Sequence, residues 1–255
     1  MLYKEIDGLK IAYTDEGQGD VVFVFHGWGA NKETMKAVQN SLIGKFRVIM
    51  PDLPGFGGSD KPNFVWGAYE YAESMEKFIN SFKLDEFSLV GHSHGGRTSI
   101  ILASRMKSQV KKMVLIDSAG LISKKSIKYY AKVYWFKCCK VIYKTLFFWQ
   151  DTEAKMERFY KKHGSQDYRD ADGIMRQIMV KVINEDLKPL LKEIQTQTLL
   201  VWGENDTATP LYMGEIMAKE IKGSGLVVIK NAGHFSYVDD YPQFNAVMRS
   251  FFGIQ

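Results

Sequence analysis

Residues 89–96 read LVGHSHGG and join an apolar run, 87–90, to a helix-compatible segment, 97–106. Where a strand turns sharply into a helix at Gly-x-Ser-x-Gly, the serine is held in a strained backbone conformation with its hydroxyl exposed. Gly91 and Gly95 carry no Cβ, so the strand and the helix can approach closely at this turn. The spacing therefore predicts that Ser93 is a nucleophile. Without these flanking elements, the same five-residue pattern would indicate only an ordinary loop.

The rest of the chain alternates short apolar runs with segments of helical period. Asp7-Gly8 predicts a hairpin between 2–6 and 9–13. Buried strands are expected at 21–25, 46–50, 87–90, 113–116, 198–202 and 226–229, with helices near 31–43, 68–82, 97–106, 210–221 and 241–252. This alternation predicts an α/β fold with a mostly parallel central sheet and helices on both faces.

Composition excludes several classes of protein. The chain has 255 residues, of which 45% are hydrophobic and 25% charged, as in a globular protein with a substantial core. No apolar run approaches the roughly 20 residues that span a bilayer, so no transmembrane segment is expected. The first residues lack the basic and then apolar pattern of a secretory signal, which favours a cytoplasmic location. Cys138 and Cys139 are adjacent, a spacing that predicts reduced packing residues rather than a disulfide or metal ligands.

The alternation of strands and helices breaks after Gly120. Between there and the strand at 198–202, the sequence is rich in lysine and aromatic residues without a clear strand. We therefore expect a core domain formed by 1–120 and 186–255, with a helical cap inserted at 121–185.

A serine nucleophile needs a base to remove its proton and an acid to orient that base. His234 follows the strand at 226–229, whereas His163 lies in a polar segment and is expected to be exposed. Asp206 follows the strand that ends at Trp202, so Asp206 and His234 are predicted at the same edge of the sheet. The order Ser93, Asp206, His234 is that of an α/β-hydrolase triad. Two other acids stay open: Asp117, which also ends a strand, and, less favoured, Glu204.

Cleavage of an ester also requires donors for the oxyanion. The backbone amide of His94, at the start of a helix, is one predicted donor. The Trp28 amide is the other, because the glycines on either side let it turn inward. The side chain of His26 is then expected to bond to neighbouring backbone and not to act as a base.

With these motifs, the chain resembles the α/β-hydrolase superfamily over nearly its whole length. The resemblance rests on HGWG at 26–29, DLPGFGGS at 52–59, GHSHGG at 91–96 and the loops of Asp206 and His234. The first two look like those of carboxylesterases, including the pimeloyl-carrier-protein methyl ester esterases. The resemblance implies a serine esterase that needs neither a metal nor an organic cofactor. His94 departs from the family, which usually has Met, Leu or another apolar residue at that position.

The resemblance leaves other functions open. Carbon-carbon bond hydrolases of this family more often have Asn where this chain has His92, and an amide hydrolase would use the same triad. Haloalkane dehalogenases and epoxide hydrolases use Asp as the nucleophile, so Ser93 argues against both. The fold also hosts proteins that bind a ligand with little turnover, which is a separate class.

The predicted cap carries the positive charge of the chain. Residues 120–189 hold 15 Lys or Arg and 8 Asp or Glu, whereas the remainder holds 19 and 21. Three interpretations follow: lysines in water over an aromatic face that lines the pocket, a docking patch for an acidic carrier or anionic substrate, or contact with anionic lipid. The expected partner is a small ester with an apolar acyl or alcohol part, and not nucleic acid.

Overall fold

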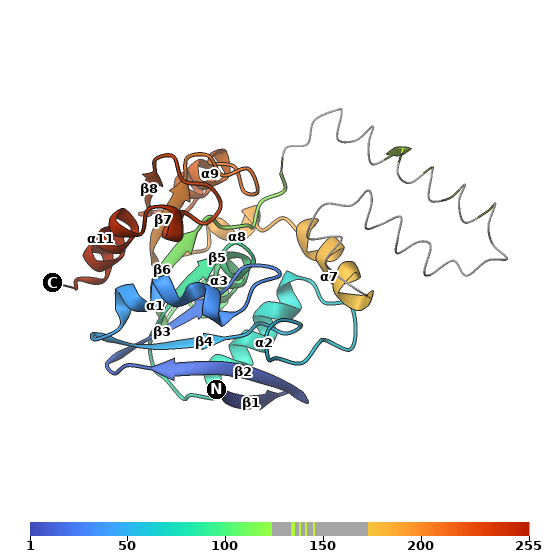
Figure 1. Ribbon diagram of the computed structural model, residues 1–255, viewed down its shortest axis with the longest axis horizontal. Helices are drawn as coiled ribbons and strands as arrows, with labels where there is room; N and C mark the ends of the chain where they lie inside the picture. The colour runs from blue at the N-terminus through green and yellow to red at the C-terminus, as the bar shows by residue number, and fades with distance from the viewer. Residues whose placement is uncertain (124–133, 136–137, 139–140, 142–144, 146–172, 255) are drawn as a thin grey trace.

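The computed structural model describes residues 1–123, 134–135, 138, 141, 145 and 173–254. Its centre is an eight-stranded sheet in the order β1-β2-β4-β3-β5-β6-β7-β8 (Figure 1). The strands are β1 (Leu2–Ile6), β2 (Leu9–Glu16), β3 (Asp20–Phe25), β4 (Phe46–Pro51), β5 (Phe87–His92), β6 (Val110–Ile116), β7 (Gln197–Gly203) and β8 (Gly225–Ile229). Each predicted strand is present, so the predicted sheet is confirmed.

The sheet is parallel except at its N-terminal edge. β1 and β2 form the predicted antiparallel hairpin, in which Asp7 and Gly8 both have positive φ, 51° and 77°. β2 pairs antiparallel with β4, while β4, β3, β5, β6, β7 and β8 are parallel neighbours. Parallel strands place their carboxyl ends at one edge, which is where loops that follow them meet.

Helices cover both faces of the sheet, as predicted. The helices within the described residues are η1 (Lys32–Met35), α1 (Lys36–Leu42), α2 (Ala68–Asn80), α3 (His94–Arg105), α7 (Gly173–Ile183), α8 (Lys188–Leu191), α9 (Tyr212–Glu220), α10 (Ser236–Asp239) and α11 (Tyr241–Phe252). Side chains of β3 alternate between two cores: Phe23 and Phe25 pack with α2 and α3, whereas Val22 and Val24 pack with α1 and α11. This alternation is the two-residue period of a strand buried on both faces.

Only part of the predicted cap lies within the described residues. α7 is joined to α2 by the Lys181–Glu70 ion pair of 2.9 Å and by the Glu185 carboxylate, which accepts from the Ala68 amide at 2.6 Å. The lysine series 124, 128 and 132, the aromatic residues 147–149, Cys139 and His163 lie outside the described residues, and the boundaries 121–185 stay a prediction. Cys138 is a free thiol, but it is exposed and therefore not the packing residue we expected.

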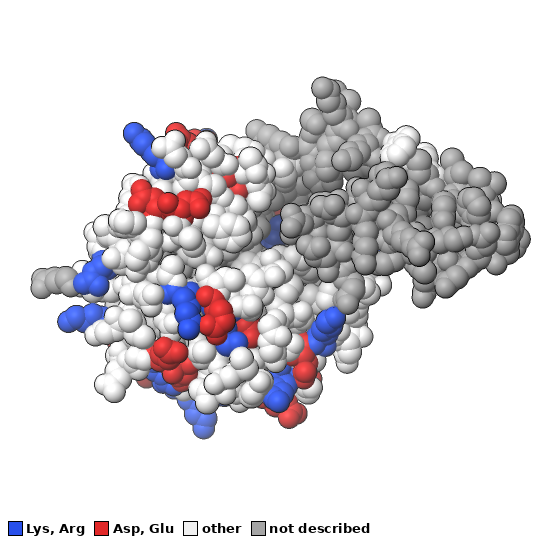
Figure 2. Space-filling model, viewed as in Figure 1, with Lys and Arg blue, Asp and Glu red and all other residues white. Residues whose placement is uncertain are grey.

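The described core carries mixed charge on the face drawn in Figure 2, where basic and acidic side chains lie among one another. Two of the ion pairs are Arg47–Asp15 and Lys77–Asp7, each at 2.7 Å. Among the described residues no helix is long and apolar enough to cross a membrane. The cytoplasmic location expected from the sequence stays a prediction.

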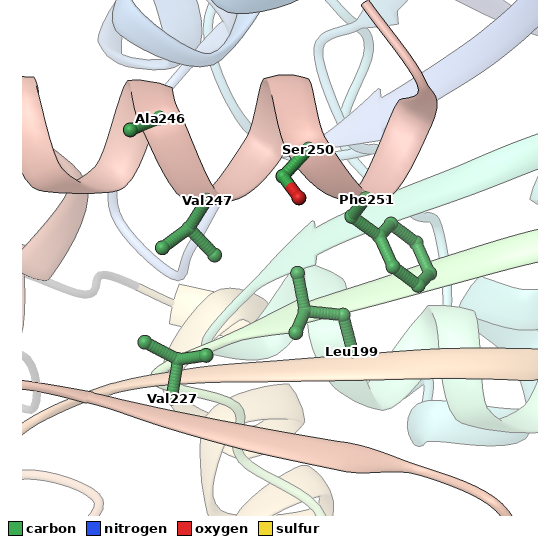
Figure 3. A pocket seen from close by; sticks show the side chains of 6 residues that line it. All are labelled: Leu199, Val227, Ala246, Val247, Ser250 and Phe251. Atoms are coloured by element: carbon green, nitrogen blue, oxygen red, sulfur yellow. The ribbon is translucent and has the colours of Figure 1, made fainter.

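An open pocket of about 420 Å³ lies between α11 and the strands β7 and β8 (Figure 3). Its lining is apolar apart from one hydroxyl and consists of Leu199, Val227, Ala246, Val247, Ser250 and Phe251. None of the predicted catalytic residues belongs to it.

Helix α3 packs so closely on β3 that a methyl group at Gly95 would collide with the Phe25 carbonyl oxygen. Because that neighbour is backbone, we predict that Gly95→Ala lowers the free energy of unfolding by at least about 2 kcal/mol. Gly225→Ala is the control, since a methyl group there meets no atom within 4 Å and is expected to change stability by less than about 0.5 kcal/mol. Urea unfolding of both variants measures the difference, and equal stabilities would contradict the predicted close packing.

Candidate active site

Ser93 lies at the sharp turn between β5 and α3. Its backbone angles are φ 49° and ψ −110°, a conformation that L residues rarely adopt. The turn is fixed on both sides, because the Ser93 amide donates to the Ile116 carbonyl at 3.1 Å and the Ser93 carbonyl accepts from the Ala119 amide at 3.0 Å. The strained serine that the Gly-x-Ser-x-Gly spacing predicts is therefore present.

The structure brings the three predicted catalytic side chains together. The distance from Ser93 Oγ to His234 Nε2 is 3.1 Å, and that from His234 Nδ1 to Asp206 Oδ2 is 2.8 Å. Asp206 is buried and His234 is partly exposed. These distances are those expected of a nucleophile, a base and an orienting acid.

Asp206 is held by its own loop. Its Oδ1 accepts from the amides of Ala208 and Thr209 at 2.8 and 3.0 Å, and the Thr209 hydroxyl lies 2.7 Å from Oδ2. Burial alone would raise the pKa of Asp206, but the hydrogen bonds from His234 and Thr209 outweigh it and lower that pKa. The acid is thus ionised and able to stabilise a positively charged imidazole. Sequence reasoning missed Thr209, although a threonine three residues after an aspartate is a recognisable turn signal.

Asp117, the alternative acid, bonds to other groups. Its carboxylate accepts from the Gly203 amide at 2.8 Å, and from the Ser236 amide and hydroxyl at 3.0 and 2.6 Å. Burial raises the pKa of Asp117 to about 6, and the bonds from Ser236 and Gly203 oppose this rise. The contact with the imidazole belongs to Asp206, whereas Asp117 ties β6 to β7 and α10. Glu204 accepts from the Asn231 amide at 3.0 Å.

His92 holds the backbone of His234 by a hydrogen bond, a role that sequence reasoning missed. Its Nε2 lies 2.8 Å from the His234 carbonyl oxygen, and the two rings are 4.9 Å apart. Burial lowers the pKa of His92 to about 3, so the neutral ring donates its Nε2 hydrogen to that carbonyl. The backbone position of His234 therefore depends on the residue beside Ser93.

The loop of residues 26–29 lies against Ser93. A methyl group at Gly27 would come within 2.9 Å of His92 Nδ1 and 3.4 Å of Ser93 Cβ, so only glycine allows this approach. The following residue is Trp28, whose ring packs on Phe56 at 4.9 Å. The His94 amide opens α3, where the first amides lack partners within the helix. The two predicted oxyanion donors thus come from the elements on either side of the nucleophile.

His26 bonds to neighbouring backbone, which is the behaviour we expected of its side chain. Its Nδ1 lies 2.8 Å from the Gly27 carbonyl oxygen, and its Nε2 accepts from the Leu53 amide at 2.9 Å. These bonds are compatible only with a neutral ring. Burial lowers the pKa of His26 to about 4.

A buried ion pair fixes the other end of the same loop. Lys32 Nζ lies 2.7 Å from Asp52 Oδ2, and the two side chains are 3% and 0% exposed. The Asp52 carboxylate also accepts from the amides of Lys32 and Gly58, at 2.7 and 2.9 Å. A buried carboxylate is tolerated when it is paired and fully hydrogen-bonded. Sequence reasoning missed this pair, because its members lie in different loops.

Within the described ranges, no cluster of three or more His, Cys, Asp or Glu side chains is placed to hold a metal ion.

The hydrogen bonds of His26 generate a prediction about pH. Its pKa in the folded protein, about 4, lies below the ordinary value of 6.5, so the unfolded chain takes up the proton first. The stability that His26 contributes is complete above pH 6.5 and is lost as the pH falls toward 4, at a limiting slope of about 1.4 kcal/mol per pH unit. We predict that the difference in unfolding free energy between the wild type and His26→Gln narrows from pH 7 to pH 5.

Urea unfolding at several pH values measures this difference. Contributions of His92 and His94 cancel, since both histidines are present in both proteins. A difference that stays constant from pH 7 to pH 5 would contradict the neutral, doubly bonded ring.

Comparison with known proteins supports the fold. Lipase 1 of Psychrobacter immobilis is 25% identical to this chain, in a match that covers 95% of this chain and 83% of that protein. The 2-hydroxy-6-oxo-6-phenylhexa-2,4-dienoate hydrolase of Burkholderia cepacia is 24% identical to this chain. The match covers 97% of this chain and 93% of that protein. A solved esterase from Exiguobacterium antarcticum has a TM-score of 0.77, 25% identity and 98% coverage of both chains.

The match to a family model covers most of the chain. The first curated relatives are 30% identical over 119 residues, but the chain spans only about a third of their length, 35%. The family model described as the alpha/beta hydrolase fold matches residues 20–137 and 140–241. Together with the sheet and the strained serine turn, this match confirms the resemblance: the chain belongs to the α/β-hydrolase family.

Proposed function

We propose that this chain is a serine hydrolase that cleaves carboxylic esters through an acyl-enzyme intermediate. The observation that carries the proposal is the continuous line of hydrogen bonds from Ser93 Oγ to His234, 3.1 Å, and from His234 to Asp206, 2.8 Å. Relatives named as a lipase and an esterase support an ester as the substrate.

Acylation begins when Ser93 Oγ attacks the ester carbonyl and His234 Nε2 takes the hydroxyl proton. The positive charge that forms on the imidazole is stabilised by the ionised Asp206, which also fixes the ring with its Nδ1 hydrogen toward the acid. Negative charge develops on the carbonyl oxygen. The amides of Trp28 and His94 are our proposed donors to it, helped by the positive end of the α3 dipole.

The tetrahedral intermediate collapses when His234 gives its proton to the leaving alcohol. Water then enters, and His234 removes a proton from it as it attacks the acyl group on Ser93. Return of that proton to Ser93 Oγ releases the acid and regenerates the enzyme. No step requires a group beyond these residues and water.

The substrate is proposed to have an apolar acyl or alcohol part. Trp28 and Phe56 pack ring to ring beside the serine turn, and Tyr71 of α2 lies in the same cluster. We further propose that residues 121–185 form a lid over this region, anchored by α7.

The predicted lid is rich in lysine, so an acidic carrier or an anionic substrate is a candidate partner for it. Binding of such a partner would be revealed if added salt inhibited the hydrolysis of acidic esters and not that of neutral ones.

Carbon-carbon bond hydrolysis is the second candidate. The relative from Burkholderia cepacia is named as a dienoate hydrolase and matches 97% of this chain. The same triad would serve such a reaction, so the distances alone do not separate it from ester cleavage.

We predict that Ser93→Ala abolishes labelling by a serine-directed fluorophosphonate. Asp206→Asn is expected to lower kcat on an aryl ester by about 10⁴-fold, because the imidazole loses the acid that fixes its tautomer. Asp117→Asn is the matched control: it keeps labelling but lowers the free energy of unfolding. An equal loss of activity in a folded Asp117→Asn protein would assign the acid to Asp117, and absence of labelling in the folded wild type would favour a binding protein.

A substrate panel separates the two candidate reactions. We predict that aryl esters graded by acyl length are hydrolysed with a higher kcat/KM than a vinylogous 1,5-diketone of equal size, since relatives named as a lipase and an esterase support an ester as the substrate. Product release is followed by absorbance for both classes. A higher kcat/KM for the diketone would replace esterase with carbon-carbon hydrolase.

A further inference from the structure

The His94 side chain is buried beside the nucleophile with its polar atoms unpaired. It is 3% exposed, and neither Nδ1 nor Nε2 has a hydrogen-bond partner among the residues that the structure describes. Its ring lies edge-on to Tyr71 at 4.6 Å and to Trp28 at 5.4 Å. Buried polar groups in folded proteins are nearly always hydrogen-bonded, so an unpaired imidazole beside a reactive serine needs a cause.

The other two buried imidazoles of this region are paired. His26 makes hydrogen bonds through both nitrogens, and His92 bonds to the His234 carbonyl. His94 therefore differs from its neighbours although it is buried to the same degree. Trp66, whose ring is 5.3 Å from Tyr71, also has an unpaired buried nitrogen, Nε1. The aromatic cluster thus contains two polar groups that lack partners.

The ring is electrically neutral. Burial and, to a smaller extent, the charge of Arg97 lower the pKa of His94 to about 3. Arg97 is itself buried and donates to the Glu185 carbonyl at 2.7 Å. A neutral imidazole presents one N–H donor and one acceptor nitrogen. Such a group suits an uncharged oxygen, whereas the charge of the nearby Arg97 guanidinium disfavours a cationic group.

The position of the ring indicates which part of an ester would reach it. His234 protonates the leaving alcohol, so the alcohol lies on the His234 side of the scissile bond. The His94 ring contacts Trp28, whose amide is a proposed oxyanion donor, and Tyr71 of α2. We assign the His94 ring to the acyl part of the substrate, because its neighbour Trp28 carries a proposed donor to the acyl carbonyl.

Resting on the proposed ester hydrolysis, we propose that the His94 imidazole is a hydrogen-bonding subsite for an uncharged oxygen, a hydroxyl or a ketone, on the acyl chain of the substrate. The apolar rings of Trp28 and Tyr71 bind the hydrocarbon around that oxygen. A hydrocarbon acyl chain would leave the imidazole unpaired in the complex as well, and a site built to bind an oxygen discriminates against such an analogue.

The test compares esters with a hydroxyl or keto group at acyl carbon 2, 3 or 4 with isosteric esters that have a methyl or methylene group there. In each enzyme the measured quantity is the ratio of kcat/KM for the oxygenated ester to that for its isostere. Because His94 also supplies an oxyanion amide, a general loss of activity is expected to cancel in this ratio. We predict that His94→Met lowers the ratio about tenfold at one carbon position, the loss typical of one hydrogen bond.

Two further variants serve as comparisons. His94→Gln, which keeps a donor and an acceptor, is expected to retain part of the preference. Tyr71→Phe removes a hydroxyl that already donates to the Pro54 carbonyl at 3.0 Å, so it is expected to leave the ratio within twofold of the wild type. A ratio that is equal in the wild type and His94→Met at all three positions would overturn the subsite.

A second measurement does not depend on the folding of a His94 variant. In Ser93→Ala protein labelled with ¹⁵N-histidine, the oxygenated ester at its preferred position is expected to shift the His94 ring nitrogens, while its isostere leaves them in place. Unmoved nitrogens with a bound ester would overturn the proposal. Failure of the wild type to cleave any ester would instead refute the proposed reaction, and a ring shift in that case would still support the subsite.

Discussion

The backbone of Ser93 is the constraint on which the site depends. Its φ of 49° exposes the hydroxyl at the carboxyl edge of the sheet, and such a conformation persists only where the surroundings enforce it. Here the enforcement is steric. A methyl group at Gly91 would strike the Gly95 carbonyl, and one at Gly95 would strike the Phe25 carbonyl, so β3, β5 and α3 approach more closely than any other residues would allow. The strained backbone conformation of Ser93 is therefore maintained by the close packing of β3, β5 and α3.

Buried polar groups also hold the loops that carry the candidate residues Asp206 and His234. Asp117 binds the end of β7 and the start of α10, and His92 binds the His234 carbonyl. Asp52 lies in the loop after β4, and its ion pair with Lys32 connects that loop to η1, which follows the loop of residues 26–29. The carboxylates of Asp117 and Asp52 each accept three hydrogen bonds, and a buried polar group that is paired in this way stabilises the fold. The geometry of the proposed triad is therefore fixed by the fold itself, as preorganised catalysis would require.

The fold and the candidate triad residues could be read from the sequence because their signals are local. Strand runs, the Gly-x-Ser-x-Gly spacing and the chain order of Ser93, Asp206 and His234 are all read from short segments. The sequence favours Asp206 but leaves Asp117 open as the acid, since both follow strands that end at the same edge. In the structure, the contact with the His234 imidazole belongs to Asp206. The Lys32–Asp52 ion pair could not be predicted, because no sequence periodicity relates two residues that lie 20 positions apart in different loops.

His94 shows how a single position can combine a general and a particular task. Its amide opens α3 wherever the turn is formed, so the main-chain contribution is independent of the side chain. The imidazole, by contrast, is an expensive group to bury without partners, and an apolar residue would pack between Trp28 and Tyr71 at lower cost. A stability argument alone therefore favours an apolar residue at this position. Retention of a neutral donor and acceptor here is explained if the missing partner is part of the substrate, because binding would then relieve a cost that the free enzyme bears.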